Sequence, residues 1–138
     1  MKTYRCLNCN KETAWTNQKT NKYCSNTCQL DYQNKSRITE WLSGKDNGTK
    51  KSGAAGWIKR YILEKQNFKC AECGIIEHNE KPIVLEIDHI DGNSYNNVES
   101  NLRCICPNCH SQSENYKNKN KGNGRAYRMI RYREGKSW

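Results

Sequence analysis

Apolar residues are sparse along this 138-residue chain and gather in short periodic runs. In the first run, Ile38, Trp41 and Leu42 recur at helical spacing behind a candidate cap at Ser36. We therefore expect a short amphipathic helix over 36–42.

A second run predicts another helix. Its apolar face consists of Trp57, Ile58, Tyr61, Ile62 and Phe68, and charged residues occupy the opposite face. We interpret Trp57 and Tyr61 as packing residues rather than as a base-stacking pair. Residues 45–56, between the two helices, are rich in Gly, Ser and Lys without an apolar period, so we expect a flexible linker there.

The apolar pattern downstream predicts two strands. Residues 83–87 form the first strand, residues 102–105 form its partner, and the loop between them is rich in Asn and Gly. Pro107 suits the first turn of a helix, which would carry His110. The predicted order is strand, loop, strand, helix.

Composition shows that an aliphatic core cannot hold this chain alone. Leu, Ile, Val and Phe make up only about 14% of the residues, and the net charge is +10, a combination typical of disordered chains. The nine cysteines offer either disulfides or metal sites. Because no N-terminal apolar segment indicates export, we favour metal sites in an intracellular, cytoplasmic protein.

Cysteine spacing predicts two structural Zn²⁺ sites. The N-terminal site would use Cys6, Cys9, Cys24 and Cys28. The second would use Cys70, Cys73, Cys106 and Cys109. Each site can contribute on the order of 10 kcal/mol to folding. Cys104 is left over, and we expect it to be a small buried residue.

Charge is distributed unevenly along the chain. Residues 70–116 carry a net −6, whereas residues 117–138 carry +7. Basic segments on either side of an acidic centre suit a protein that binds a polyanion with the basic segments and a cation with the acidic centre. The C-terminal residues expected to contact the phosphates of such a polyanion are Lys117, Lys119, Lys121, Arg125, Arg128, Arg131 and Arg133. A merely solvated basic tail remains the alternative.

The acidic centre contains a candidate catalytic site. Asp88 and His110 can converge on one divalent cation, Mg²⁺ or Mn²⁺, and leave most of its coordination sphere open. His89 would remain free as a general base for water, and Asn101 would hold its ring. Since neighbouring strand residues face opposite sides, the strand must end or bulge at Asp88 and His89 for both to serve one site.

These residues resemble the HNH endonuclease family, of the phage or mobile-element type. The resemblance lies in the Asp88-His89 pair, Asn101 in "ESNLRCICPNCH", His110 and the "CAECG" knuckle, and it extends over residues 57–116. It implies a ββα-metal finger with a treble-clef-like zinc site. It also implies metal-dependent hydrolysis of double-stranded DNA, with one strand nicked per active site, and a homing or other mobile-element enzyme.

The expected fold class is therefore a small, zinc-stabilised α+β protein. Its expected parts are a zinc module (1–34), a short helix and linker (35–56), an HNH nuclease domain (57–117) and a basic extension (118–138). No apolar run reaches membrane-spanning length. The alternative function is a non-catalytic zinc protein that binds nucleic acid. The target sequence, the preferred catalytic metal and the choice between monomer and dimer stay open.

Deletion of residues 119–138 should weaken DNA binding and flatten its dependence on salt. Each lost phosphate contact lowers the slope of log K against log salt by about 0.9. Binding measured at several salt concentrations checks this expectation. An unchanged slope would show that the tail is only a solvated extension.

Overall fold

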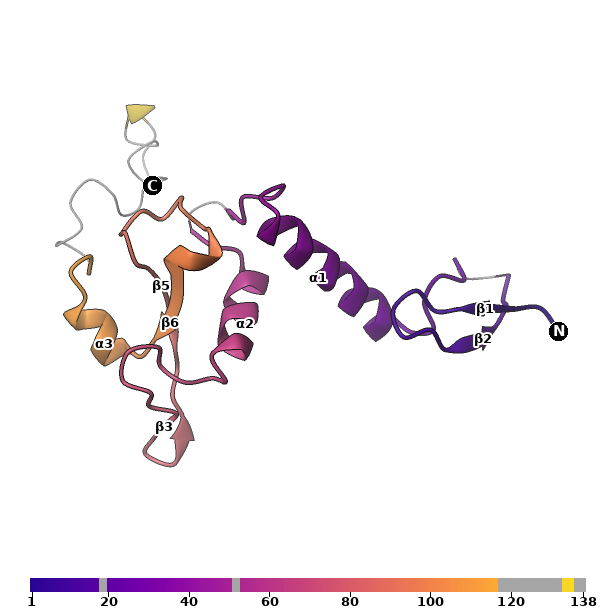
Figure 1. The fold of residues 1–138 in the computed structure, drawn as a ribbon, viewed down its shortest axis with the longest axis horizontal. Helices are drawn as coiled ribbons and strands as arrows, with labels where there is room; N and C mark the ends of the chain where they lie inside the picture. Colours follow the sequence, from indigo (N-terminus) through magenta and orange to yellow (C-terminus); the bar gives the residue numbers. More distant parts are fainter. Residues whose placement is uncertain (18–19, 51–52, 117–132, 136–138) are drawn as a thin grey trace.

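The computed structural model shows a small α+β protein and describes residues 1–17, 20–50, 53–116 and 133–135 (Figure 1). Its helices are α1 (Asn26–Leu42), α2 (Gly56–Lys65) and α3 (Pro107–Gln112), with a 3₁₀ turn η1 (Glu99–Asn101). Its antiparallel strand pairs are β1 (Thr3–Arg5) with β2 (Glu12–Ala14), β3 (Glu77–His78) with β4 (Lys81–Pro82), and β5 (Glu86–His89) with β6 (Leu102–Ile105). No helix in the described part of the chain has the length and apolar character needed to cross a membrane.

Helix α1 joins the β1–β2 hairpin to the rest of the molecule (Figure 1). It begins much earlier than the sequence predicted, because Ser25 and not Ser36 is its cap: the Ser25 hydroxyl accepts from the Cys28 N–H at 3.1 Å. The first turns of α1 escaped prediction because they are polar, and Trp41 is the buried residue of the helix. The predicted end at Leu42 is confirmed.

The prediction of a flexible linker over 45–56 is wrong for the described residues of that segment. Thr49 and Ala54 form an antiparallel bridge, and the Ala55 N–H donates to the Gly48 carbonyl at 2.8 Å. Gly48 is buried with a φ of +69°, and a Cβ added there would lie 2.3 Å from Ile58 Cδ1 and 3.0 Å from Trp41 Nε1. Glycine therefore allows this segment to pack closely between α1 and α2.

Aromatic packing joins α1 to α2. The Trp41 ring meets Trp57 and Tyr61 edge to face, with centroids 6.0 Å and 5.6 Å apart. The interpretation of Trp57 and Tyr61 as packing residues is thus confirmed. The placement of Phe68 on the same face is wrong, because α2 ends at Lys65 and Phe68 is 56% exposed with a φ of +55°.

The β5–β6 pair and α3 form the C-terminal part of the described fold. The strand predicted at 83–87 begins later, at Glu86, and ends at His89, so the strand does end at the Asp-His pair. The second strand is confirmed at Leu102–Ile105, and Pro107 is the first residue of α3, as predicted. Asp88 lies opposite Arg103 in the antiparallel register.

The core lies where α2 packs on β6. Its fully buried side chains are Ile58, Cys104 and Ile105, so the prediction of a buried Cys104 is confirmed. Trp41 joins the same cluster from α1. This core is small, in keeping with the low aliphatic content.

Substitution of Gly48 should destabilise the fold through overpacking. Gly48→Ala is expected to lower the free energy of unfolding by about 1–3 kcal/mol more than Gly44→Ala. Gly44 is a matched control, because it also has a positive φ (+79°) but nothing within 4 Å of an added Cβ. Urea unfolding of the zinc-loaded variants measures the difference, and equal losses would contradict the packing argument.

Candidate functional site

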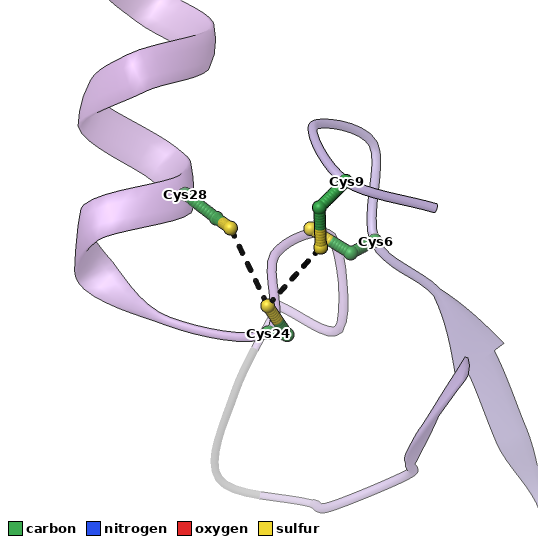
Figure 2. A group of neighbouring side chains, drawn as sticks. All are labelled: Cys6, Cys9, Cys24 and Cys28. Atoms are coloured by element: carbon green, nitrogen blue, oxygen red, sulfur yellow. Dashed lines mark hydrogen bonds between the residues drawn. The ribbon is translucent and has the colours of Figure 1, made fainter. Parts of the chain in front are cut away.

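Four cysteines gather where the β1–β2 hairpin meets α1. Figure 2 shows Cys28 on α1, Cys24 just before it, and Cys6 and Cys9 from the turn after β1. Their sulfur atoms all lie within 4.8 Å of one another, with 3.6 Å between Cys9 and Cys24 and 3.4 Å between Cys24 and Cys28. A tetrahedral zinc with Zn–S bonds of about 2.3 Å has S–S edges of about 3.8 Å, so the cluster fits Zn²⁺.

A second group of four sulfur atoms lies near the C-terminal end of β6, and these atoms are also all within 4.8 Å of one another. Its members are Cys70, Cys73, Cys106 and Cys109. Cys73 Sγ is 3.8 Å from Cys106 Sγ, and the Cys106 N–H donates to Cys70 Sγ at 3.2 Å. Gly74 follows the first pair with a φ of +73°, which permits the tight turn. Both predicted cysteine groups are therefore brought together by the fold.

Backbone N–H groups favour thiolates at one position in each group. The N–H of Cys9 is the main cause that lowers the pKa of Cys6 to about 6. Burial opposes ionisation of Cys70, but the N–H groups of Cys73, Cys106 and Glu72 lower its pKa to about 6.

Other thiols in the same groups resist ionisation. The pKa of Cys24 is raised to about 12 by its hydrogen bond with Cys28, and that of Cys109 is raised to about 12 by its hydrogen bond with Cys106. A cation bound in each group would favour the thiolate form of all four sulfurs. Cys104 behaves differently, because burial raises its pKa to about 11 and it belongs to neither group.

A small hollow of about 140 Å³ brings three predicted site residues together: Asp88, His89 and His110. Asp88 is buried near the end of β5, and His110 lies on α3. Asp88 Oδ1 is 3.8 Å from His110 Nε2. Since cation–oxygen and cation–nitrogen bonds are about 2.0–2.2 Å long, these two atoms fit as ligands of one divalent cation.

Two charged residues that the sequence analysis missed orient Asp88 and His110. Arg103 Nε donates to Asp88 Oδ2 at 2.8 Å. The same guanidinium also forms an ion pair with Glu72, which lies between Cys70 and Cys73 in the chain. His110 Nδ1 donates to Glu86 Oε2 at 2.5 Å, which leaves His110 Nε2 available to a metal. The sequence could have indicated Glu86, because it lies two positions before Asp88 and therefore on the same face of the strand. The contact of Arg103 with Asp88 could not be predicted in this way, because it depends on the register of β5 and β6.

The ring of His89 is held by Asn97 rather than by Asn101. His89 is half-buried, and its Nε2 lies 2.7 Å from Asn97 Oδ1. Asn101 Nδ2 instead donates to Asp91 Oδ1 at 2.9 Å and to the Asn96 carbonyl at 2.8 Å. The predicted contact between Asn101 and the ring is thus wrong, because the turn η1 directs Asn101 into the loop between the strands.

Asp91 anchors that loop. Burial acts against its ionisation, but hydrogen bonds from Asn96, the Asn93 N–H and Asn101 lower the pKa of Asp91. The charged carboxylate therefore fixes the path of the chain immediately after the Asp-His pair.

Comparison with known proteins supplies the family resemblance. The chain is 43% identical over 67 residues to the H-N-H endonuclease F-TflIV of Escherichia phage T5. The resemblance to H-N-H endonucleases is confirmed. The aligned segment covers 47% of this chain and 30% of the phage protein, so the H-N-H similarity supports a nuclease over part of each chain. No family model and no solved structure matches the chain.

The predicted DNA contacts of this H-N-H-like chain fall mostly outside the described residues. Lys117, Lys119, Lys121, Arg125, Arg128 and Arg131 all lie in 117–132, beyond the described range. Arg133 is described, and it is exposed.

Metal analysis should return two zinc ions per chain, one for each cysteine group. Cys70→Ser should lose one zinc and unfold the part of the protein around β6, because it removes a ligand buried at the base of the core. Cys104→Ala is the matched control: it also removes a buried sulfur, yet it should retain both zincs. A stoichiometry of one in the parent protein would contradict one of the two assignments.

Proposed function

We propose that this chain is a metal-dependent DNA endonuclease of the H-N-H type that nicks one strand per active site. The observation that carries this proposal is the convergence of Asp88, His89 and His110 on one hollow, with the ligand atoms of Asp88 and His110 3.8 Å apart. The similarity to a phage H-N-H endonuclease supports DNA as the substrate.

Asp88 and His110 would hold Mg²⁺ or Mn²⁺. When bound, such a cation offsets negative charge on the scissile phosphate and on the leaving oxygen. Arg103 keeps one oxygen of Asp88 occupied and Glu86 fixes the ring of His110, so both ligands are oriented by the protein itself.

His89 would act as the general base. It accepts a proton from the attacking water, whose oxygen forms the new bond to phosphorus. The bond from phosphorus to the 3′ oxygen breaks, and that oxygen takes a proton from solvent. The products are a 5′-phosphate and a 3′-hydroxyl.

The architecture supports a ββα-metal finger as the catalytic unit. Strands β5 and β6 and helix α3 follow one another in the required order, and the second cysteine group would join them in a treble-clef-like arrangement. We extend the nuclease unit from 57–117 to include the end of α1 and residues 45–56, because Trp41 and Gly48 pack on α2.

The other parts of the chain would assist in binding. Residues 1–34 would form a separate zinc module, and residues 118–138 a basic extension that contacts double-stranded DNA. The proposed biological setting is a homing or other mobile-element enzyme, and the relative it is similar to is a phage protein.

Relaxation of supercoiled plasmid by the zinc-loaded protein tests this proposal. Parent protein should nick the plasmid with Mg²⁺ or Mn²⁺ and stop when a chelator is added. His89→Ala should cut about 10²-fold to 10⁴-fold more slowly, because the general base is lost. His78→Ala is the matched control, since His78 lies exposed on β3, and it should cut at the parental rate. Parent protein that binds DNA without cutting it under any divalent metal would favour a non-catalytic nucleic-acid-binding protein.

Substitution of the proposed metal ligands should affect cleavage differently from substitution of His89. Asp88→Ala and His110→Ala should also silence cleavage, but higher concentrations of Mg²⁺ or Mn²⁺ should restore part of it, because a binding affinity has been weakened. Titration of the metal at saturating DNA measures this recovery. Equal recovery of His89→Ala would contradict the separate roles.

A further inference from the structure

A buried asparagine lies behind the proposed general base. Asn97 is 2% exposed, and its side-chain oxygen is 2.7 Å from His89 Nε2. A buried amide must satisfy both its oxygen and its NH₂ group, so each of its partners is informative.

Two further partners of Asn97 come from far upstream in the chain. Asn97 Nδ2 donates to Thr49 Oγ1 at 3.1 Å, and the Asn97 carbonyl accepts from Trp41 Nε1 at 2.7 Å. Trp41 is itself buried in the core at the end of α1. Asn97 is therefore held at two points, its side chain by Thr49 and its backbone carbonyl by Trp41.

This arrangement selects one tautomer of His89. With Nδ2 directed to Thr49, Asn97 Oδ1 faces the ring, and a carbonyl oxygen can only accept. In the neutral imidazole, His89 Nε2 is then the nitrogen that carries the proton. Nδ1 is left as the unprotonated ring nitrogen, which is the state that a general base for water requires.

We propose that Asn97 is the positioning residue for the general base: it fixes the His89 ring in the Nε2–H tautomer and leaves Nδ1 to accept the proton of water. The inference rests on the proposed role of His89. It makes the end of α1 and the segment around Thr49 part of the catalytic machinery, because they hold Asn97 in place.

Mutation can separate the side-chain contacts of Asn97 from its backbone contact. The backbone carbonyl makes the contact with Trp41, and it survives in any variant. The side chain makes the contacts with His89 and Thr49. Asn97→Ala therefore removes the positioning contact and keeps the tie to α1.

Kinetics form the first arm of the experiment. With zinc-loaded full-length protein at saturating Mg²⁺, Asn97→Ala should lower kcat for plasmid nicking on the order of 10²-fold, the effect of a misplaced catalytic group, and leave KM unchanged. Asn97→Asp keeps an acceptor for Nε2–H and should recover most of kcat. Asn96→Ala is the matched control, because Asn96 lies in the same loop and its side chain donates to Asp91 instead of contacting His89.

The second arm does not depend on activity. Nitrogen-15 NMR of histidine-labelled protein, with His89 assigned by comparison with His89→Ala, reports which ring nitrogen carries the proton. The parent protein, Asn97→Asp and Asn96→Ala should show the Nε2–H tautomer. Asn97→Ala should show a mixture of the two tautomers. If Asn97→Ala does not fold, as judged by zinc content, Thr49→Val replaces it and should shift the same signals in the same direction.

The outcomes separate this inference from the proposed function. An Nδ1–H tautomer in the parent, or an Asn97→Ala variant with parental kcat and parental tautomer while His89→Ala is inactive, overturns the role of Asn97 alone. Parental cleavage by His89→Ala overturns the general base and the inference with it. A loss in Asn96→Ala equal to that in Asn97→Ala would reduce Asn97 to a structural residue of the loop.

Discussion

The second cysteine group is the constraint on which the rest of the fold depends. Cys70 follows α2, and Cys106 stands between β6 and α3, so four sulfurs within 4.8 Å join three elements at one point. The apolar core above this point is small, and Ile58 and Ile105 are its fully buried aliphatic side chains. Metal–thiolate bonds in this group would supply stability that burial of apolar surface cannot supply in a chain with so few aliphatic residues.

The same group also determines where the candidate active site lies. Pro107 starts α3 directly after Cys106, which places His110 on the first turns of that helix. Glu72, within the first cysteine pair, binds Arg103, and Arg103 in turn binds Asp88. The second cysteine group and the proposed catalytic ligands are thus connected by a short chain of charged contacts, so loss of the first would disturb the geometry of the second.

The candidate site is completed from the opposite side by residues that precede α2 in the chain. The end of α1 and the packed turn at Gly48 reach the loop between β5 and β6 through Trp41, Thr49 and Asn97. Helix α1 is therefore more than a connector between two cysteine groups. Its last turn lies in the core that supports the His89 ring.

The sequence by itself determined the features that depend on residue type and local spacing. The cysteine groups, the strand over Leu102–Ile105, the start of α3 at Pro107 and the burial of Cys104 all followed from patterns within a few residues, since ligand pairs, alternation and proline geometry act locally.

Only the tertiary structure decided which side chains meet. The roles of Glu86 and Arg103 depend on strand register, and the close packing at Gly48 depends on side chains from two helices. Asn97 and Asn101 stand four positions apart in one loop, and the path of that loop alone directs Asn97 to His89 and Asn101 to Asp91. Such choices rest on contacts between residues far apart in the chain, which no local pattern encodes.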